Sequence, residues 1–364
     1  MKQALKKYQL QLKVCGPVFV GDGLEIQKKE YMFLDRETIG IIDAGKLYQM
    51  AKRRHLESDL EQFMLINNKE DLRHWTERNR VPFKELQSCM KYTIHTGDIQ
   101  RNKARMQIMS CIKDPYGNPY LPGSSIKGML RTVLGCDELL ANPERYRREA
   151  QRVKNDLKED SGRRRNQVLV RNARDIEAQI FHTLDRTDHK VDAVNDRMCG
   201  IVVGDSEPLS TEDLILCQKW EQHTDGSYKT INLLRECLKP GTIIKADLTI
   251  DETVNPITPD QIQRAVKNFY EQYYDVFQKK FARQDRKSDQ TVFVGGGSGF
   301  VSKTVVYSLL EEREAVPVVR EIFRKTGASM GRENIRLNVS PRILKCTRYQ
   351  GKEYMMGQCE LKII

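Results

Sequence analysis

Residues 118–134 read Asn118-Pro119-Tyr120-Leu121-Pro122-Gly123-Ser124-Ser125-Ile126-Lys127-Gly128-Met129-Leu130-Arg131-Thr132-Val133-Leu134. This order predicts a turn, a sharp Pro-Gly break and then a helix. From Ile126 onward the apolar residues recur at helical spacing, so one side of the helix is expected to be buried. Ser124 or Ser125 is the expected N-cap, because a hydroxyl can accept hydrogen bonds from the free amides of the first helical turn.

The same stretch gathers groups that suit a phosphate. Lys127 and Arg131 are four residues apart and share a helix face. Gly123 and Gly128 allow another backbone or a ligand to come close. A helix N-terminus with exposed amides, hydroxyls and two cations is a typical anion site. An ordinary helix entry with solvated cations explains the stretch as well, so both interpretations remain open at this point.

Length and composition limit the kind of protein. The 364 residues favour two domains over one, and the 39% hydrophobic and 30% charged fractions are typical of a soluble globular chain. No apolar run is long enough to cross a membrane, and the first residues lack the apolar core of a secretory signal, so a cytoplasmic location is expected. The net charge of +11 favours a polyanionic partner, nucleic acid first and an anionic membrane surface second.

Cysteine and histidine patterns argue against a redox or metal site. The nine cysteines are odd in number and form no CxxC pair, so buried, reduced thiols are expected, with Cys15, Cys111 and Cys217 inside apolar runs. The six histidines are scattered, and none has another His or a Cys at ligand spacing. We expect no cofactor and no metal.

The order of strand and helix signals predicts an α+β fold. The expected division is an N-terminal domain at 1–142, a highly charged helical insertion or linker at 143–195, and a C-terminal domain at 196–364. Three local expectations are specific. Residues 231–238 and 242–250 form an antiparallel pair, residues 93–105 form a loop or a projecting hairpin, and the aromatic stripe between Ile262 and Phe281 packs in the core.

A glycine run supplies a second candidate site. Val292-Phe293-Val294 predicts a strand that ends in Gly295-Gly296-Gly297-Ser298-Gly299, followed by a helix from Val301 to Leu310 that carries Lys303. A P-loop needs glycine directly before its Lys-Ser/Thr pair, and Ser302 stands there instead, so nucleotide hydrolysis is rejected. A glycine turn with a lysine can still hold a sugar-phosphate chain. A tight packing corner between strand and helix is the competing interpretation.

His95 supports one enzymatic alternative. It lies beside Tyr92 in a basic context, and a histidine there could serve a metal-independent RNA endonuclease that forms a 2′,3′-cyclic phosphate. No acid–base pair of carboxylates is evident from the spacing. A basic scaffold that binds only proteins is a weaker alternative.

Several blocks, in chain order, resemble one family. They are Gly16-Pro17-Val18-Phe19-Val20-Gly21-Asp22-Gly23, then Tyr116 to Gly128 with Arg131, Asp205-Ser206-Glu207-Pro208, Gln218-Lys219-Trp220, and Gly295 to Gly299 with Lys303-Thr304. Together they resemble the CRISPR RAMP superfamily and, within it, the fifth subunit of the type III-A Csm effector complex. The resemblance spans nearly the whole chain.

The resemblance implies two ferredoxin-like (RRM-like) RAMP domains with helical insertions. It implies a non-catalytic, crRNA-binding subunit that caps the effector filament at the crRNA 3′ end and supports crRNA maturation in antiviral defence. Implied partners are crRNA, target RNA, the repeated backbone RAMP subunit, the small helical subunit and a host trimming nuclease, with no membrane. The expected RNA-binding residues are Gly21, Gly123, Ser124, Ser125, Lys127, Arg131, Gly295, Gly296, Gly297, Ser298 and Lys303.

Overall fold

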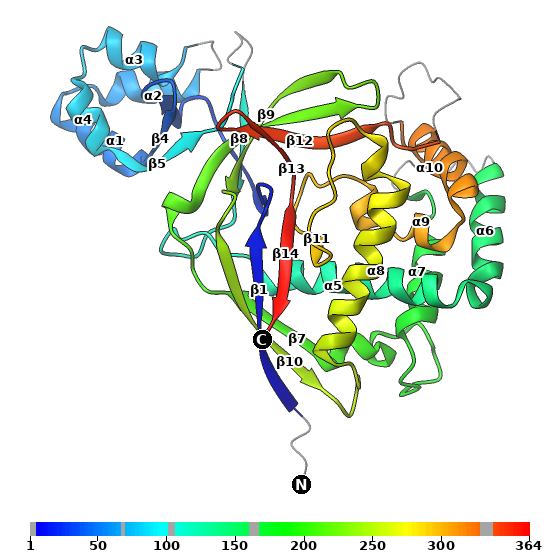
Figure 1. The fold of residues 1–364 in the computed structure, drawn as a ribbon. Coiled ribbons are helices and arrows are strands. Elements are labelled where there is room, and N and C mark those ends of the chain that lie inside the picture. Colours follow the sequence, from blue (N-terminus) through cyan, green and yellow to red (C-terminus); the bar gives the residue numbers. More distant parts are fainter. Residues whose placement is uncertain (1–4, 67–69, 101–105, 160–166, 328–337) are drawn as a thin grey trace.

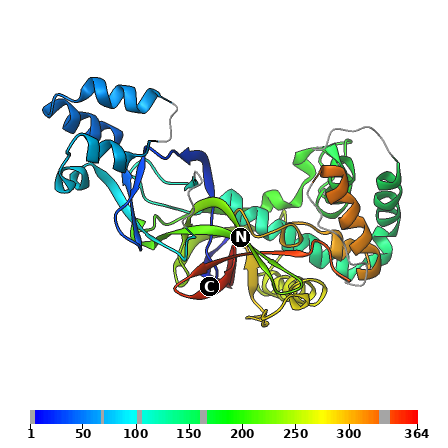
Figure 2. The same ribbon diagram turned by 90° about the horizontal axis from the view of Figure 1, so that it is seen from above.

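The computed structural model describes residues 5–66, 70–100, 106–159, 167–327 and 338–364. It contains two β-sheets, of five and nine strands, with helices gathered at both ends of the molecule (Figures 1 and 2). The mixed α/β fold predicted from the sequence is confirmed. The strands are β1 (Leu5–Val14), β2 (Gly21–Ile26), β3 (Tyr31–Phe33), β4 (Thr38–Ile42), β5 (Met90–Thr96), β6 (Gln107–Cys111), β7 (Ile201–Ser206), β8 (Leu214–His223), β9 (Tyr228–Leu238), β10 (Ile243–Asp251), β11 (Thr291–Phe293), β12 (Ile343–Tyr349), β13 (Lys352–Met355) and β14 (Gln358–Ile363).

The helices fall into three groups, which are the helical insertion α1–α4, the pair α5 and α8 on the five-stranded sheet, and a group formed by α6, α7, α9 and α10. Their bounds are α1 (Ala44–Arg53), α2 (Glu57–Leu65), α3 (Leu72–Arg78), α4 (Phe83–Ser88), α5 (Gly123–Ala141), α6 (Arg147–Lys158), α7 (Val170–Phe181), α8 (Pro259–Val276), α9 (Val306–Leu309) and α10 (Glu312–Thr326).

The five-stranded sheet is antiparallel throughout, in the order β11-β14-β1-β10-β7. Along the chain β1, α5, β7, β10, α8 and β14 follow one another as β-α-β-β-α-β. Because these elements come from residues 5 to 363, the sheet crosses the boundaries expected at 142 and 196. The division into domains therefore stays a prediction, and the sheets do not follow it.

Helices α5 and α8 bury their apolar sides in the main core with this sheet. Ile126 and Leu130 of α5 and Val266 and Phe269 of α8 are all at most 3% exposed. The aromatic stripe is buried as predicted. Helix α8 begins at Pro259 with a capping box, in which Thr258 accepts from the amide of Gln261 and the Gln261 side chain accepts in return.

The nine-stranded sheet runs β2-β6-β9-β8-β5-β4-β3, and β12 pairs with the far half of β8 and with β13. The predicted pairing of residues 231–238 with 242–250 is wrong, because β9 lies in this sheet and β10 in the other. The turn at Lys239-Pro240-Gly241 carries the chain from one sheet to the other. The predicted loop or projecting hairpin at 93–105 is wrong for residues 93–96, which belong to β5 and pair with β4 and β8 inside the sheet. Residues 101–105 lie outside the described residues.

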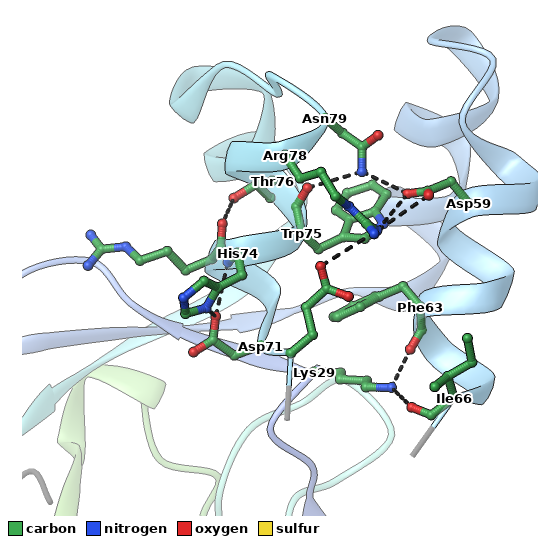
Figure 3. Close-up of polar contacts among 12 residues, drawn as sticks. Lys29, Asp59, Phe63, Ile66, Asp71, His74, Trp75, Thr76, Arg78 and Asn79 are labelled. Carbon is green, nitrogen blue, oxygen red and sulfur yellow. Dashed lines mark hydrogen bonds and ion pairs between the residues drawn. The ribbon is translucent and has the colours of Figure 1, made fainter. Parts of the chain in front are cut away.

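The helical insertion α1–α4 separates β4 from β5 and projects from one end of the molecule (Figures 1 and 2). It has its own small core, in which the rings of Phe63 and Trp75 lie 5.7 Å apart. Its polar side chains bond to one another, as Figure 3 shows for Arg78 and Asn79, which both donate to Asp59. In the same view Asp71 caps α3 by accepting from the amide of His74 at 3.0 Å.

The segment after α5 is helical, as predicted, and forms α6 and α7 at the opposite end of the molecule from the insertion (Figure 1). The predicted helix over Val301–Leu310 is wrong in its extent. The structure has a short 3₁₀ helix, η7 (Val301–Lys303), and then the one-turn helix α9. Lys303 therefore lies in a compact turn, without the aligned amides of a long helix. Among the described residues, none of the helices combines the length and apolar composition that a membrane span requires.

Candidate nucleic-acid interface

The glycine turn, residues Gly295–Gly299, follows β11 and packs against the loop that precedes β2. Its Gly296 amide donates to the carbonyl of Phe19 at 2.6 Å. Gly295 has φ +76°, and a Cβ there would lie 2.2 Å from the same carbonyl oxygen. Only glycine fits this conformation and this approach. Two blocks that are far apart in the sequence, 16–23 and 295–299, thus form one corner.

Arg235 of β9 fills the space beside this turn. A Cβ on Gly297 would lie 2.4 Å from its Nη1 atom, so the glycine makes room for the guanidinium. The guanidinium lies over the ring of the buried Phe19, 5.2 Å from the ring centroid. Its Nε atom is buried without a hydrogen-bond partner, and Arg235 makes no ion pair with any described residue. A partly buried cation without a counter-ion is costly, so the position suits an external anion.

Three lysines lie near Arg235, and they are Lys219, Lys303 and Lys345. We call these four residues the cationic cluster. Lys219 lies on β8. Lys345 lies on the adjacent β12, where it is the cross-strand partner of Glu221. Glu221 is the carboxylate within reach: it pairs with Lys345 and lies 3.8 Å from Lys219. Four cations therefore face one paired carboxylate in this part of the described chain.

The pKa values of two lysines in the cluster are lowered by partial burial and by this excess of positive charge. Partial burial, and then the charge of Arg235, lower the pKa of Lys303. Partial burial and the charge of Lys345 lower the pKa of Lys219. Burial alone would raise the pKa of Glu221, but its hydrogen bond with Lys345 and the neighbouring cations lower it. A phosphate group bound nearby would favour the charged forms of Lys219 and Lys303 and would raise their pKa values again.

Two other predicted residues belong to the same corner. A Cβ on Gly21, at the start of β2, would lie 2.7 Å from the ring of Phe19. Ser298 is 5% exposed, and its carbonyl and hydroxyl both contact the hydroxyl of Ser302, at 3.0 and 3.2 Å. Both residues shape the corner, and Ser298 ties it to the 3₁₀ helix that carries Lys303.

The N-terminus of α5 is organised differently. The helix begins at Gly123 with Pro122 as N-cap, so the predicted serine cap is wrong. The carboxylate of Asp205 accepts from the Gly123 amide at 2.8 Å, and Ser206 accepts from the Leu121 amide at 2.9 Å. A Cβ on Gly123 would lie 2.2 Å from the carbonyl oxygen of Val203. The first amide of this helix is therefore capped from within the chain, by the strand β7 that passes close to it.

The other residues predicted on α5 point in two directions. Ser124 is exposed, and Ser125 and Lys127 are half-buried. Arg131 instead bonds to Asp196 at 2.6 Å and to Glu177 at 3.1 Å, and its guanidinium lies over the Phe181 ring. Lys127 makes no ion pair with a described residue, so the two cations that share a helix face in the sequence have separate surroundings.

Comparisons with known proteins identify the family of the chain. The model of the RAMP superfamily matches residues 11–302. The CRISPR system Cms protein Csm5 of Mycobacterium tuberculosis is 30% identical over 392 aligned positions, covering 100% of this chain and 99% of the relative. The chain belongs to the Csm5 family of RAMP proteins. Csm5 of Enterococcus italicus is 24% identical, covering 98% of this chain and 97% of that protein.

Solved structures show the same fold. A chain of a type III-A Csm–crRNA–target RNA ternary complex superimposes with a TM-score of 0.69 at 20% identity, covering 98% of this chain and 100% of that chain. The crystal structure of Csm5 from T. onnurineus gives a TM-score of 0.64 at 18% identity, covering 96% and 99%. The family assignment from the sequence blocks is thus confirmed.

Sequence reasoning missed most of the cationic cluster. Lys219 lies in the Gln218-Lys219-Trp220 block of the Csm5 family, where its two neighbours are buried and it alone is half-exposed. Arg235 and Glu236 interrupt the apolar run from Leu233 to Leu238, and charged residues in such a run were the available signal. Lys345 carries no signal of its own, since only the pairing of β12 with β8 brings it to the site.

His95, the alternative catalytic residue, is exposed on β5 in a surface hollow with Arg36, Glu37 and Asp98. Tyr92, expected beside it, donates to the buried Glu236 at 2.7 Å, so the two side chains do not meet. Glu236 also accepts from Lys113 at 2.5 Å and from the amide of Cys111 at 3.0 Å, which makes it an internal polar group of the nine-stranded sheet.

Cysteines and metal ligands add no further site. All nine cysteines are free, and Cys111 and Cys217 are buried as predicted, whereas Cys15 is half-buried. Burial raises the pKa of the Cys111 thiol to about 12, which makes it a poor nucleophile. No three His, Cys, Asp or Glu side chains in the described parts of the chain are grouped so that they could hold a metal ion.

Proposed function

We propose that this chain is a non-catalytic, crRNA-binding subunit of a type III-A CRISPR effector complex. In this role it caps the filament at the crRNA 3′ end and supports crRNA maturation in antiviral defence. One observation carries the proposal: the cationic cluster lies beside a glycine turn, and Arg235, whose Nε atom is buried without a hydrogen-bond partner, lies against that turn. Membership of the Csm5 family supports the assignment to a CRISPR complex.

The chemistry of the site favours the RNA backbone over the bases. Guanidinium and ammonium groups bind phosphate oxygens, and a glycine turn lets the sugar-phosphate chain approach the protein backbone. Such contacts carry no sequence information, which suits a guide whose spacer varies. The proposed contact residues here are Gly295, Gly296, Gly297 and Lys303, with Lys219, Arg235 and Lys345 added, while Gly21 and Ser298 shape the corner.

The residues on α5 have unequal parts in this proposal. Ser124, Ser125 and Lys127 form a second and weaker RNA contact, because no described ion pair holds Lys127. Gly123 and Arg131 position the helix, since Asp205 and the pair Glu177 and Asp196 hold them.

The proposal extends to architecture and partners. The β-α-β-β-α-β connectivity of the five-stranded sheet, with its core order β14-β1-β10-β7, supports one ferredoxin-like RAMP unit, and the nine-stranded sheet would contain the second. The partners are crRNA, target RNA, the repeated backbone subunit, the small helical subunit and a trimming nuclease. The endonuclease alternative is not favoured, because Tyr92 bonds to Glu236 and leaves His95 without that partner.

The test is assembly of the complex with an altered subunit. We expect a complex that contains the chain with Arg235→Glu and Lys303→Glu to lose this subunit from the guide and to contain longer crRNA 3′ ends. The matched control reverses two exposed cations away from the site, Lys52→Glu and Lys84→Glu in the helical insertion. Retention of the altered subunit with unchanged guide length would contradict the proposal.

A further inference from the structure

A cavity of about 350 Å³ lies between α5, α7 and the segment that follows the glycine turn. Its walls are mostly apolar and include Ile176, Ile180 and Phe181 of α7, Leu309 of α9 and Ile322 of α10. The volume is in the range of sites that bind small flat molecules. The family assignment and the phosphate contacts proposed above do not account for this cavity.

Two polar side chains that line the cavity have unmet hydrogen bonds. Asn172 is 3% exposed and donates from its Nδ2 to Asp156 at 2.8 Å. Because only the amide nitrogen can donate to a carboxylate, this contact fixes the orientation of the side chain. Its Oδ1 is then a buried acceptor without a partner, and the Oγ1 of Thr304 is also buried without a partner. Such atoms are unusual in a folded protein, and a bound molecule with hydrogen-bonding groups on its edge would satisfy both.

The cavity and the proposed RNA site share Lys303. Lys303 lines the cavity and also feels the charge of Arg235 at the glycine turn. Thr304 is the next residue along the chain. Arg131 of α5 lines the cavity as well. The two stretches that the sequence singled out for phosphate, on α5 and after the glycine turn, therefore meet at this cavity.

We propose that the cavity receives one nucleobase of the single-stranded RNA whose backbone lies on the glycine turn. The inference rests on the proposed function and adds a base-binding site to it. A base has two flat faces that pack against apolar walls and an edge with N–H donors, which matches the apolar lining and the free acceptor of Asn172. Lys303 would hold the phosphate next to that base, since it belongs to both sites. One base would then leave the stack at a fixed place along the guide.

The experiment closes the cavity with a substitution at its exposed mouth, so that the buried lining stays unchanged. Ala173 of α7 lines the cavity and is exposed, so Ala173→Trp places an indole at the mouth, whereas Ala173→Ser leaves the mouth open. Thr304→Val is the second variant; it keeps the shape of the side chain and removes the unpartnered hydroxyl. The probe is a single-stranded RNA that carries 2-aminopurine at one position, moved along the strand, and each variant is checked by thermal melting.

We expect 2-aminopurine fluorescence to change on binding at one position in the parent chain and in Ala173→Ser, and to stay unchanged in Ala173→Trp. The RNA affinity of Ala173→Trp should fall roughly tenfold, as expected for loss of one bound base. Thr304→Val should weaken binding by a smaller factor without loss of melting temperature. If Ala173→Trp does not fold, the same position-specific signal reduced in Thr304→Val supports the inference.

Three outcomes would overturn the inference. Equal RNA affinity of the parent chain and Ala173→Trp, with no position-specific signal, would exclude a base in the cavity and leave the proposed function intact. Adenosine monophosphate binding that Ala173→Trp blocks, with RNA binding unaffected, would make the cavity a site for a free nucleotide. Absence of RNA binding by the parent chain would remove both proposals.

Discussion

The glycine turn at 295–299 and the N-terminus of α5 contain the same kinds of residues, but their charges are neutralised differently. At α5, Asp205 accepts from the first amide and Arg131 has two carboxylate partners. At the glycine turn, Arg235 and Lys303 have no carboxylate partner among the described residues, and their pKa values are lowered. In both places the glycines allow another part of the chain to approach closely, and remote residues determine whether the neighbouring cations have a carboxylate partner within the chain.

The contrast also has an energetic side. An internal carboxylate stabilises the fold and removes the need for a ligand, whereas a partly buried cation without a partner destabilises the free protein. A ligand that supplies the missing charge recovers this energy on binding. We therefore expect loss of the carboxylate partners at α5 to act mainly on stability and loss of the unpaired cations at the glycine turn to act mainly on RNA affinity.

The largest expected effect is on RNA binding. Arg235→Met with Lys303→Met should lower the affinity for single-stranded RNA roughly 100-fold at low salt, about 1.4 kcal/mol for each lost phosphate contact. The slope of log affinity against log salt should become shallower by about 1.4, or 0.7 for each contact. Fluorescence anisotropy over a salt series measures both.

The matched pair at α5 is Ser124→Ala with Lys127→Met, and its affinity should fall by less than about fivefold, as expected for a single exposed charge. Equal losses of RNA affinity in the two double variants would contradict the comparison, because the glycine turn and the start of α5 would then have the same function.

Glycine substitutions should separate the two places by their effect on folding. Gly295→Ala combines φ +76° with a Cβ 2.2 Å from a backbone oxygen, so we expect a loss of about 2–3 kcal/mol in the free energy of unfolding. Gly128→Ala, on the exposed face of α5, meets nothing within 4 Å and should gain about 0.5–1 kcal/mol. Urea denaturation measures both, and a loss at Gly128 would show that its small size is needed.

Much of the fold could be predicted from local pattern. The strand before the glycine turn, the helix after Pro122-Gly123 and the buried aromatic stripe between Ile262 and Phe281 were predicted, and the structure contains all three. These features depend on periodicity and turn residues, which neighbouring residues determine. Pairing between sheets depends on residues far apart, and for that reason the expected 231–238 and 242–250 pair was wrong.

The candidate site was predictable only in part for the same reason. The glycine run could be recognised as a candidate site from the sequence because successive glycines indicate a turn that another group approaches closely. Lys303 lies four residues after the end of this run. Arg235 and Lys345 reach the turn only through the register of β8 with β9 and β12, which no local pattern contains. Asp205, which accepts from the Gly123 amide, lies 82 residues further along the chain, so local pattern could not predict this contact either.

A smaller effect is expected from removal of that cap. Asp205→Ala leaves the Gly123 amide without its acceptor and removes a negative charge near a helix N-terminus, so stability should fall by about 1 kcal/mol. Asp205→Asn keeps an acceptor and should lose less. RNA affinity should change little in either variant. A gain of RNA affinity in Asp205→Ala would show that the carboxylate competes with a phosphate for this helix N-terminus.

The smallest effect concerns Lys303 and its lowered pKa. Between the folded pKa and the ordinary value of 10.5, the unfolded chain keeps a proton that the folded chain has released, so stability rises with pH in this window. Below the window the charged lysine is slightly destabilising, and Lys303→Met should melt at a slightly higher temperature than the parent. RNA affinity should fall over the same alkaline range, because Lys303 loses its charge. Melting and anisotropy of both chains between neutral pH and pH ~10 test this, since the difference between them isolates one lysine. A Lys303→Met chain that is less stable at neutral pH would mean that Lys303 has an internal partner, and the glycine turn would then resemble α5.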